Sequence, residues 1–269
     1  MLQATPILPA QLTPPLKWAG GKRWLVPQLA RIWHRYSANH RLVEPFVGGM
    51  SVALGLQPRL ALLNDVNLHL INFYRWLQGG LIAELSFENE SDYYYQARDR
   101  FNELISSGYE GSQEAAELFY FLNRTGFNGL CRFNKSGGFN VPFGRYKTIN
   151  YIYDFLDYAE QLADWDFTST DFSELQYERN DFVYADPPYD VDFTAYSAGG
   201  FTWDDQVRLA EMLAELRGPV VASNQATPRV LNLYKNLGFS ITTLEAPRRI
   251  SSDGDRTPAL EMLATLNLN

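Results

Sequence analysis

An acid, two prolines and a tyrosine follow an apolar segment at residues 181–185: Asp186, Pro187, Pro188 and Tyr189. A residue that precedes proline is pushed toward extended backbone, so Asp186 is expected to continue a strand to its last position. Pro187 lacks an N–H group but keeps its carbonyl oxygen, so the carboxylate and this carbonyl can face one point. Two acceptors beside the Tyr189 ring suit an aromatic amino group, which has two protons to donate. The alternative is that these residues form only a turn.

Glycines and a second acid lie at two other predicted strand ends. Gly48 and Gly49 end one predicted strand, and Asp65 ends the next. An acid roughly 20 residues beyond a glycine turn commonly binds ribose hydroxyls. The full glycine pattern of a dinucleotide site is absent, because Met50 stands where a small residue is expected. An ordinary glycine turn and a helix-capping acid are the alternative.

The elements that must position these residues alternate between strand and helix. This alternation implies a mostly parallel sheet covered by helices on both faces. Ligands bind outside the carboxyl ends of such strands, where the acids and glycines lie. A hairpin of the last two strands would place an antiparallel strand at the end of the sheet. The strands are predicted within residues 41–49, 60–65, 164–170, 181–186, 219–224, 239–244 and 260–266, and helices at 66–78, 203–216 and 228–237.

The helix at residues 203–216 has the clearest start signal. Thr202 is followed three residues later by Asp205, the spacing of a capping box. Its apolar face is predicted from the helical period to consist of Trp203, Val207, Ala210 and Ala214.

The chain divides by composition into a sheet domain and an insertion. Residues 1–15 are expected to be a loose tail without the pattern of a signal peptide. Residues 16–78 and 161–269 are predicted to form the sheet domain, and the mainly helical segment 79–160 interrupts it. No apolar run approaches the ~18 residues of a membrane span, so no membrane partner is expected. A single cysteine and three scattered histidines indicate neither a disulfide nor a metal site.

The charge is distributed unevenly. The chain has 23 Lys and Arg residues against 31 Asp and Glu residues, a net charge of -8 that argues mildly against a nucleic-acid partner. Residues 1–43 and 118–153, however, contain eleven of these cations and no acid. Such segregation permits an anionic partner on one side of the protein, although a solvated face would also explain it.

Six segments together resemble the DNA adenine methylase family of S-adenosylmethionine-dependent N6-adenine methyltransferases, from Lys17 to about Leu266. They follow the family's order, and the departures are Met50 in the glycine turn and Phe127 where tyrosine is common. The segments are LKWAGGK (16–22), VEPFVGG (43–49), LNRTGFNGLCRFN (122–134) with FNVPFGRY (139–146), DPPY (186–189), FTAYSAGGF (193–201) and RRISSDG (248–254).

The resemblance implies a Rossmann-like class I methyltransferase sheet with an antiparallel end strand and an inserted helical target-recognition domain. It implies methyl transfer from S-adenosylmethionine, without a metal, to N6 of adenine in double-stranded DNA. On this resemblance the target base is expected to flip out of the duplex and stack on Tyr189, with its amino group bound by Asp186 and Pro187. The recognition segment favours the site GATC. The resemblance also suggests a monomeric bacterial or phage enzyme of the cytoplasm, either stand-alone or paired with a restriction system.

The resemblance also assigns binding residues. Some of these assignments have alternatives: Trp18 could only pack in the core, Lys22 could be a surface lysine at a helix start, and the arginines could contact phosphate without reading bases. Rival functions are methylation of RNA or of a protein amide, and DNA binding without catalysis. The cofactor residues implied are Trp18, Lys22, Phe46, Gly48, Asp65 and Asp186; the DNA-binding residues are Lys17, Arg124, Phe127, Asn128, Arg132, Pro142, Arg145 and Tyr146.

Overall fold

A seven-stranded sheet is the centre of the protein, in a computed structural model that describes residues 12–189, 200–246 and 259–268. The strand order is β3-β2-β1-β4-β5-β7-β6, and β7 runs antiparallel to both of its neighbours. The prediction of a mostly parallel sheet with an antiparallel end is therefore confirmed. The strands are β1 (Arg41–Glu44), β2 (Ala61–Asn64), β3 (Trp165–Thr168), β4 (Asp181–Ala185), β5 (Val220–Gln225), β6 (Ser240–Ala246) and β7 (Ala259–Leu266).

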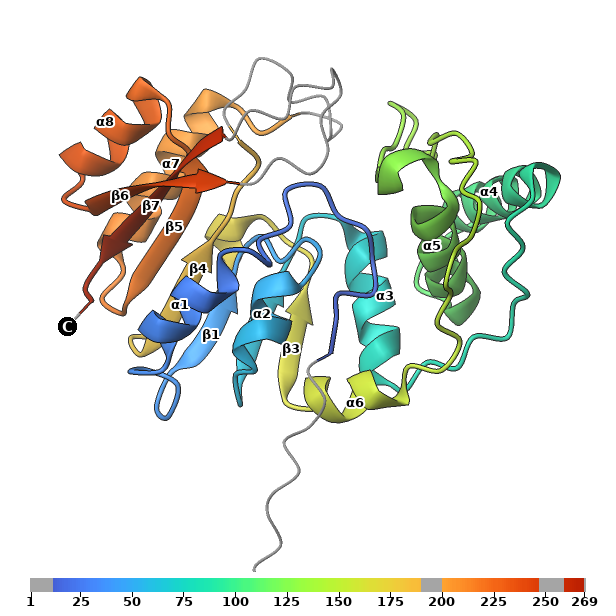
Figure 1. Ribbon diagram of the computed structural model, residues 1–269, viewed down its shortest axis with the longest axis horizontal. Helices are drawn as coiled ribbons and strands as arrows, with labels where there is room; N and C mark the ends of the chain where they lie inside the picture. Colours follow the sequence, from blue (N-terminus) through green and yellow to red (C-terminus); the bar gives the residue numbers. More distant parts are fainter. Residues whose placement is uncertain (1–11, 190–199, 247–258, 269) are drawn as a thin grey trace, which may run out of the picture.

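Helices cover both faces of this sheet (Figure 1). Adjacent residues of β1 show the two faces, because Leu42 packs in one apolar cluster with α1 and α3 and Val43 packs in another with α7 and α8. Strand β4 is buried along its whole length, as expected for a strand covered on both sides. The helices are α1 (Val26–Trp33), α2 (Ser51–Leu56), α3 (Leu68–Gln78), α4 (Ser91–Ser106), α5 (Gln113–Thr125), α6 (Leu156–Leu162), α7 (Trp203–Glu215) and α8 (Pro228–Asn236).

The helical insertion shares its core with the sheet domain. Helix α5 packs against α3 and α4, and the rings of Phe73 on α3 and Tyr120 on α5 stack with centroids 5.6 Å apart. One continuous buried cluster contains these rings together with Leu42 of the sheet. The insertion therefore leaves the sheet domain through α3 and is held firmly against it. Helix α6 begins before the expected boundary at residue 160 and ends beyond it.

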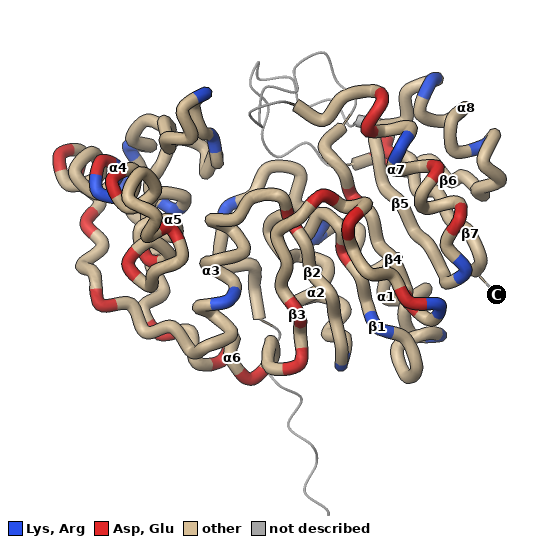
Figure 2. Tube along the Cα trace, turned by 180° about the vertical axis from the view of Figure 1, so that it is seen from behind, with Lys and Arg blue, Asp and Glu red and all other residues tan. Residues whose placement is uncertain are grey.

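The carboxyl ends of the strands and the loops after α5 lie on the same side of the molecule. In Figure 1 the arrows of β1, β3 and β4 point upward, and the loops that follow α5 lie at the upper right. Figure 2 shows basic positions in these upper loops, while acidic positions are frequent on the lower side near α6 and β3. Only the second acid-free window, residues 118–153, lies in these loops; Arg41 of the first window begins β1 at the opposite end of the sheet.

The buried face of α7 differs from the predicted one. The capping box of Thr202 and Asp205 is present as expected. The helix, however, is rotated so that its buried residues are Gln206, Leu209, Ala210 and Leu213, and of the four predicted residues only Ala210 is buried. The predicted face is shifted by about one residue along the helix, so it missed Leu209 and Leu213, while Trp203 and Ala214 pack only partly buried at its edge. The inner face also holds Gln206, which binds backbone and side-chain partners.

Candidate active site

The turn after β4 carries the proposed catalytic acid. Its carboxylate is bound on both oxygens: Ser223 Oγ donates to Oδ1 at 2.8 Å, and Lys22 Nζ lies 3.0 Å from Oδ2 of Asp186. The side chain of Asp186 is 19% exposed, so it is not fully buried. A fixed, partly accessible carboxylate can accept further hydrogen bonds from a ligand.

Lys22 is a buried cation and not a surface lysine, since its side chain is only 3% exposed. Its ammonium donates to the carbonyl of Gly20 at 2.9 Å and lies 3.8 Å from Oε2 of Glu261 on β7. It also lies 4.7 Å from the centroid of the Tyr189 ring. A buried ammonium requires such partners, and here they tie the N-terminal segment to the catalytic turn.

Two buried carboxyl groups lie around this turn, and neither was predicted from the sequence to belong to the site. Glu44 ends β1 and its pKa is raised well above the ordinary value, mainly by burial and further by Asp186. Burial also raises the pKa of Glu261 on β7, against the opposing charge of Lys22. Each is an acid inside an otherwise apolar strand, which is the signal that could have identified it.

The indole of Trp18 covers the glycine turn after β1. Gly48 has φ +45°, and a Cβ atom there would lie 2.7 Å from Trp18 Nε1; a Cβ atom on Gly49 would lie 2.7 Å from Trp18 Cβ. Only glycine permits this approach. Met50, the residue that departs from the family pattern, follows with φ 58°, and its side chain is fully buried in the core.

Asp65 is brought to the same turn. One carboxylate oxygen accepts the amide of Gly48 at 3.1 Å, and the other accepts the amide of Asn67 at 3.0 Å. Burial nevertheless raises the pKa of Asp65 to about 6. Helix α3 is capped by Asn67 and not by Asp65, so the capping alternative was wrong. Asp65 lies beside the glycines, as the ribose-binding prediction requires.

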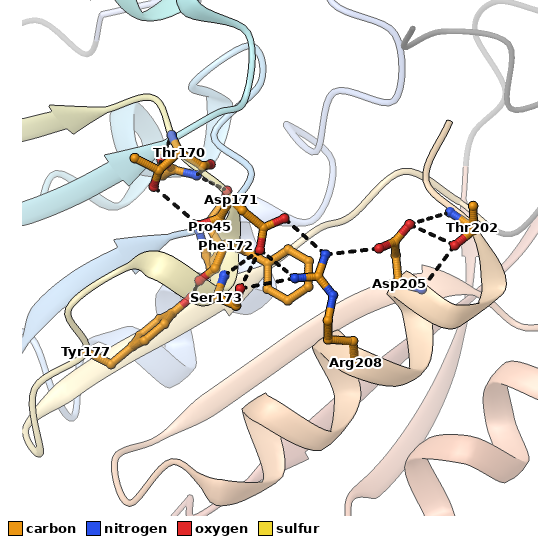
Figure 3. A network of polar contacts seen from close by, with 10 residues as sticks. Pro45, Thr170, Asp171, Phe172, Ser173, Tyr177, Thr202, Asp205 and Arg208 are labelled. Carbon is orange, nitrogen blue, oxygen red and sulfur yellow. Dashed lines mark hydrogen bonds and ion pairs between the residues drawn. The ribbon is translucent and has the colours of Figure 1, made fainter. Parts of the chain in front are cut away.

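Three phenylalanine rings line the ends of β1 and β3. The ring centroid of Phe46 lies 5.5 Å from that of Phe172 and 5.6 Å from that of Phe201. Figure 3 shows Arg208 of α7 between Asp171 and Asp205, and its guanidinium lies 4.3 Å from the Phe172 ring centroid. Phe172 and Phe201 were not predicted, although each is an aromatic residue close after a strand end or before a helix.

Two loops of the insertion form the surface that carries most of the predicted DNA-binding residues. The amide of Phe127 donates to the carbonyl of Pro142 at 2.8 Å, which joins segment 126–130 to segment 141–146. Phe127 is 48% exposed, and Asn128, Pro142 and Arg145 are exposed beside it. An exposed aromatic side chain on a braced loop is available to contact a ligand.

Arg132 is held in a fixed position on the neighbouring hairpin. Its Nε donates to Asn140 Oδ1 at 2.8 Å and its Nη2 donates to the Asn140 carbonyl at 3.1 Å. Asn102 of α4 binds both the amide and the carbonyl of Phe139, which fixes the hairpin to the insertion. The guanidinium is therefore oriented before any ligand binds.

Lys17 and Arg124 connect the N-terminal segment to the insertion. The Lys17 ammonium donates to the Arg124 carbonyl at 2.7 Å and lies 3.5 Å from the centroid of the Tyr146 ring. Burial, and secondarily the charge of Arg124, lowers the pKa of Lys17 to about 8. The Arg124 guanidinium donates to the carbonyls of Pro15 and Asn150, at 3.5 and 3.2 Å. Arg124 therefore has a structural role, whether or not it also contacts phosphate.

A mostly parallel sheet with a reversed strand β7, and with acids and a glycine turn at the strand ends, defines a class I methyltransferase. The chain belongs to the D12 class of N6 adenine-specific DNA methyltransferases, whose pattern matches residues 18–250. It is thus an enzyme that acts on adenine in DNA.

Relatives support this assignment over most of the chain. The Escherichia coli retron Ec67 DNA adenine methylase is 37% identical over 93% of this chain and 90% of its own length. A Vibrio cholerae DNA adenine methylase is also 37% identical, over 93% of this chain and 94% of its own. The Lactococcus lactis type II methyltransferase M1.LlaDCHI is 35% identical over 88% and 89%. These relatives include a retron enzyme and a type II methyltransferase, so their names do not show whether this chain is stand-alone or paired with a restriction system.

Within the described ranges, no three His, Cys, Asp or Glu side chains are grouped as metal ligands would be. In the same part of the chain, every helix is too short or too polar to cross a membrane. The predicted residues of the segments 193–199 and 248–254 lie outside the described residues.

Proposed function

We propose that the chain transfers the methyl group of S-adenosylmethionine to N6 of adenine in double-stranded DNA, with the target base flipped out of the helix. The observation that carries this proposal is the Asp186 carboxylate, fixed by Lys22 and Ser223 and still partly exposed at the end of β4. Pro187 follows it with a carbonyl and no N–H group, so both groups accept hydrogen bonds.

These two acceptors address the difficulty of the reaction. The lone pair of the adenine amino group is delocalised into the ring, so N6 is a poor nucleophile. Hydrogen bonds from its two protons to Asp186 and the Pro187 carbonyl favour the tetrahedral form, in which the lone pair is free. The N6–carbon bond then forms as the carbon–sulfur bond breaks. The fixed carboxylate stabilises the positive charge that develops on N6, which afterwards loses one proton.

The residues around the turn suit the methyl donor. When bound, S-adenosylmethionine supplies an electrophilic methyl group on a sulfonium, so the protein need only align it. Asp65 offers a carboxylate for ribose hydroxyls, the Phe46 ring and its neighbours offer an apolar wall for a purine, and Lys22 offers a positive charge for a carboxylate. Among the described residues, Glu44 Oε1 is buried without a hydrogen-bond partner, so a polar atom remains available to a ligand.

The recognition surface suits duplex DNA. The exposed Phe127 can wedge into the base stack beside a flipped adenine, and its missing hydroxyl does not matter for wedging. Arg132 is held in one orientation on the hairpin, and Arg145 lies in segment 141–146. Both can read guanine edges in the major groove. We propose GATC as the site, on the resemblance of this loop to the family's recognition segment, and a monomer acting in the cytoplasm.

Incubation with labelled methyl donor and plasmid DNA, followed by sequencing that detects N6-methyladenine, tests this proposal. The expected result is methylation of adenine at GATC that survives EDTA. Asp186→Ala should lower turnover about 10²–10³-fold, as the loss of one transition-state hydrogen bond commonly does. A variant that keeps more than half of the wild-type turnover would end the catalytic assignment of Asp186, and methylation confined to RNA or protein would end the proposed substrate.

A further inference from the structure

Two neighbouring residues of β5 reach the catalytic turn from opposite faces of the sheet. Strand β5 pairs in parallel with β4, and Ala185 lies opposite Ala222. The next two residues of β5 are Ser223 and Asn224, whose side chains point to opposite faces because strand residues alternate. Ser223 binds the Asp186 carboxylate directly, whereas Asn224 acts through a residue of α7.

On the first face, a chain of two hydroxyl groups ends at Asp186. Tyr184 Oη and Ser223 Oγ lie 2.8 Å apart, and Ser223 Oγ lies 2.8 Å from Asp186 Oδ1. An ionised carboxylate only accepts hydrogen bonds, so Ser223 donates to it and the hydroxyl of Tyr184 donates to Ser223. The direction of the whole chain is therefore set by the acid at its end.

On the second face, a chain of two amides ends at Pro188. Asn224 Nδ2 donates to Gln206 Oε1 at 2.9 Å, and Gln206 Nε2 donates to the Pro188 carbonyl at 2.8 Å. The amide of Gln225 donates to Asn224 Oδ1, so the orientation of this side chain is fixed as well. A carbonyl can only accept, so this chain too has a single possible direction.

Both chains are buried. Tyr184, Ser223 and Gln206 are each 1% exposed and Asn224 is not exposed. Burying this many polar groups is unfavourable unless all of them are hydrogen-bonded, and apolar residues would fill the space more simply. The two chains bind the residues on either side of Pro187, so they fix the place from which its carbonyl projects.

We propose that Ser223, supported by Tyr184, and Gln206, supported by Asn224, are positioning residues for methyl transfer. They hold the Asp186 carboxylate and the Pro187 carbonyl at the spacing required to accept both protons of the adenine amino group. None of the four needs to touch the base. This inference rests on the proposed function, because it concerns the geometry of the same two acceptors.

The test is the single-turnover rate of methyl transfer at saturating cofactor and DNA, measured beside the affinities for both. Ser223→Ala should lower the rate about 10–10²-fold, because the acceptor loses its orientation, while both dissociation constants stay within about threefold. Tyr184→Phe should lower the rate less, since Ser223 keeps its bond to Asp186. Tyr234→Phe is the matched control, because this buried tyrosine lies on α8 and its hydroxyl has no partner among the described residues.

Gln206→Glu gives a readout that a merely structural role would not move. A protonated carboxyl group can donate to the Pro188 carbonyl, whereas an ionised one repels it. The rate of this variant relative to wild type should therefore rise as pH falls from 8 to 5.5. Thermal melting of each variant checks that it is folded.

The outcomes separate the inference from the proposed function. Wild-type transfer to DNA adenine tests the function itself, and its failure would remove both. Where the wild type is active, a rate within twofold of wild type for both Ser223→Ala and Tyr184→Phe, together with a pH-independent relative rate for Gln206→Glu, would overturn the positioning role alone. Should Ser223→Ala or Gln206→Glu fail to fold, Tyr184→Phe against Tyr234→Phe decides the matter.

Discussion

The side-chain amide of Asn123 binds the backbone of Lys17 in both directions. Its oxygen accepts the Lys17 amide at 2.9 Å, and its nitrogen donates to the Lys17 carbonyl at 2.8 Å. Asn123 lies in the last turn of α5, immediately before the recognition loops, and Lys17 directly precedes Trp18 of the cofactor segment. This pair therefore connects the segment proposed to bind the cofactor with the loops proposed to bind DNA. Lys17 lies in the first of these and is itself a predicted DNA contact.

DNA affinity should depend on pH through Lys17. Its pKa is lowered to about 8, so the ammonium is charged below pH 8 and neutral above it. If Lys17 contacts DNA, the dissociation constant should increase as pH rises from 7 to 9, a range in which an ordinary lysine does not titrate. Fluorescence anisotropy with a labelled duplex measures this directly. Lys17→Arg should bind without the pH dependence, and a flat wild-type profile would contradict the assignment.

The buried ammonium of Lys22 should be needed for stability as well as for cofactor binding. Lys22→Met leaves Asp186 and Glu261 facing each other without a cation. Removing one partner of a buried ion pair costs about 3 kcal/mol, so the midpoint of urea unfolding should fall accordingly. Adding Glu261→Gln should recover part of this loss, because only one carboxylate then remains. Equal stability of the single variant and the wild type would show that the pair contributes nothing.

Asp65 should have opposite effects on cofactor affinity and on stability as pH changes. Burial raises its pKa to about 6 from an ordinary 3.8. The folded state therefore keeps a proton that the unfolded state has lost, and the contribution of Asp65 to stability falls as pH rises from about 4 to 6. The ionised form is the one that accepts hydrogen bonds from ribose, so affinity for S-adenosylmethionine should increase over pH 5 to 7.

Calorimetry on wild type and Asp65→Asn at several pH values separates these effects. The variant should bind the cofactor more weakly by about 1–3 kcal/mol at pH 7, and its affinity should no longer change with pH. It keeps a side chain of the same size beside Gly48 and Asn67. An unchanged affinity in a folded variant would leave Asp65 only with the structural role of binding the amides of Gly48 and Asn67.

The sheet could be predicted because most of its strands are short runs rich in apolar residues; β6 is the exception, since it is mostly exposed. Every strand of the fold lies within one residue or so of a predicted segment, apart from the two-residue extension of β6 to Ala246. Asp186 and Asp65 were placed by the same reasoning, since a residue that ends a parallel strand must lie at the ligand-binding edge. Local pattern and topology were sufficient for these positions.

The partners of these acids could not be predicted, because pairing across the sheet depends on register. Ser223 is 37 residues from Asp186 in the chain, and Gln206 is 18 residues from Pro188. Each is an ordinary polar residue in its own segment, and the apolar face predicted for α7 was shifted so that it did not include Gln206. A polar residue inside an apolar strand or helix face is a signal worth following when no other explanation is evident.

Recognition of the DNA sequence and binding of the DNA backbone should be separable at Arg132 and Lys147. Arg132 is braced by Asn140, so its guanidinium is oriented, whereas Lys147 is exposed. If Arg132 reads a guanine edge, Arg132→Ala should lose about 1–3 kcal/mol of discrimination at one base pair. If Lys147 contacts only phosphate, Lys147→Ala should weaken binding equally on every sequence and reduce the salt slope by about one.

The measurement is kcat/KM for both variants on GATC duplexes and on single-base variants of this site, at two salt concentrations. Arg132→Ala should bring near-cognate activity toward cognate activity. Asn140→Ala is the matched variant, because it leaves the guanidinium in place but removes the oxygen that Nε binds, so it should relax specificity by a smaller amount. Equal losses on all sequences for Arg132→Ala would make it a phosphate contact. The residue that reads the sequence would then have to be sought at Arg145, at Lys17 or elsewhere in the loop; the guanidinium of Arg124 already binds two backbone carbonyls.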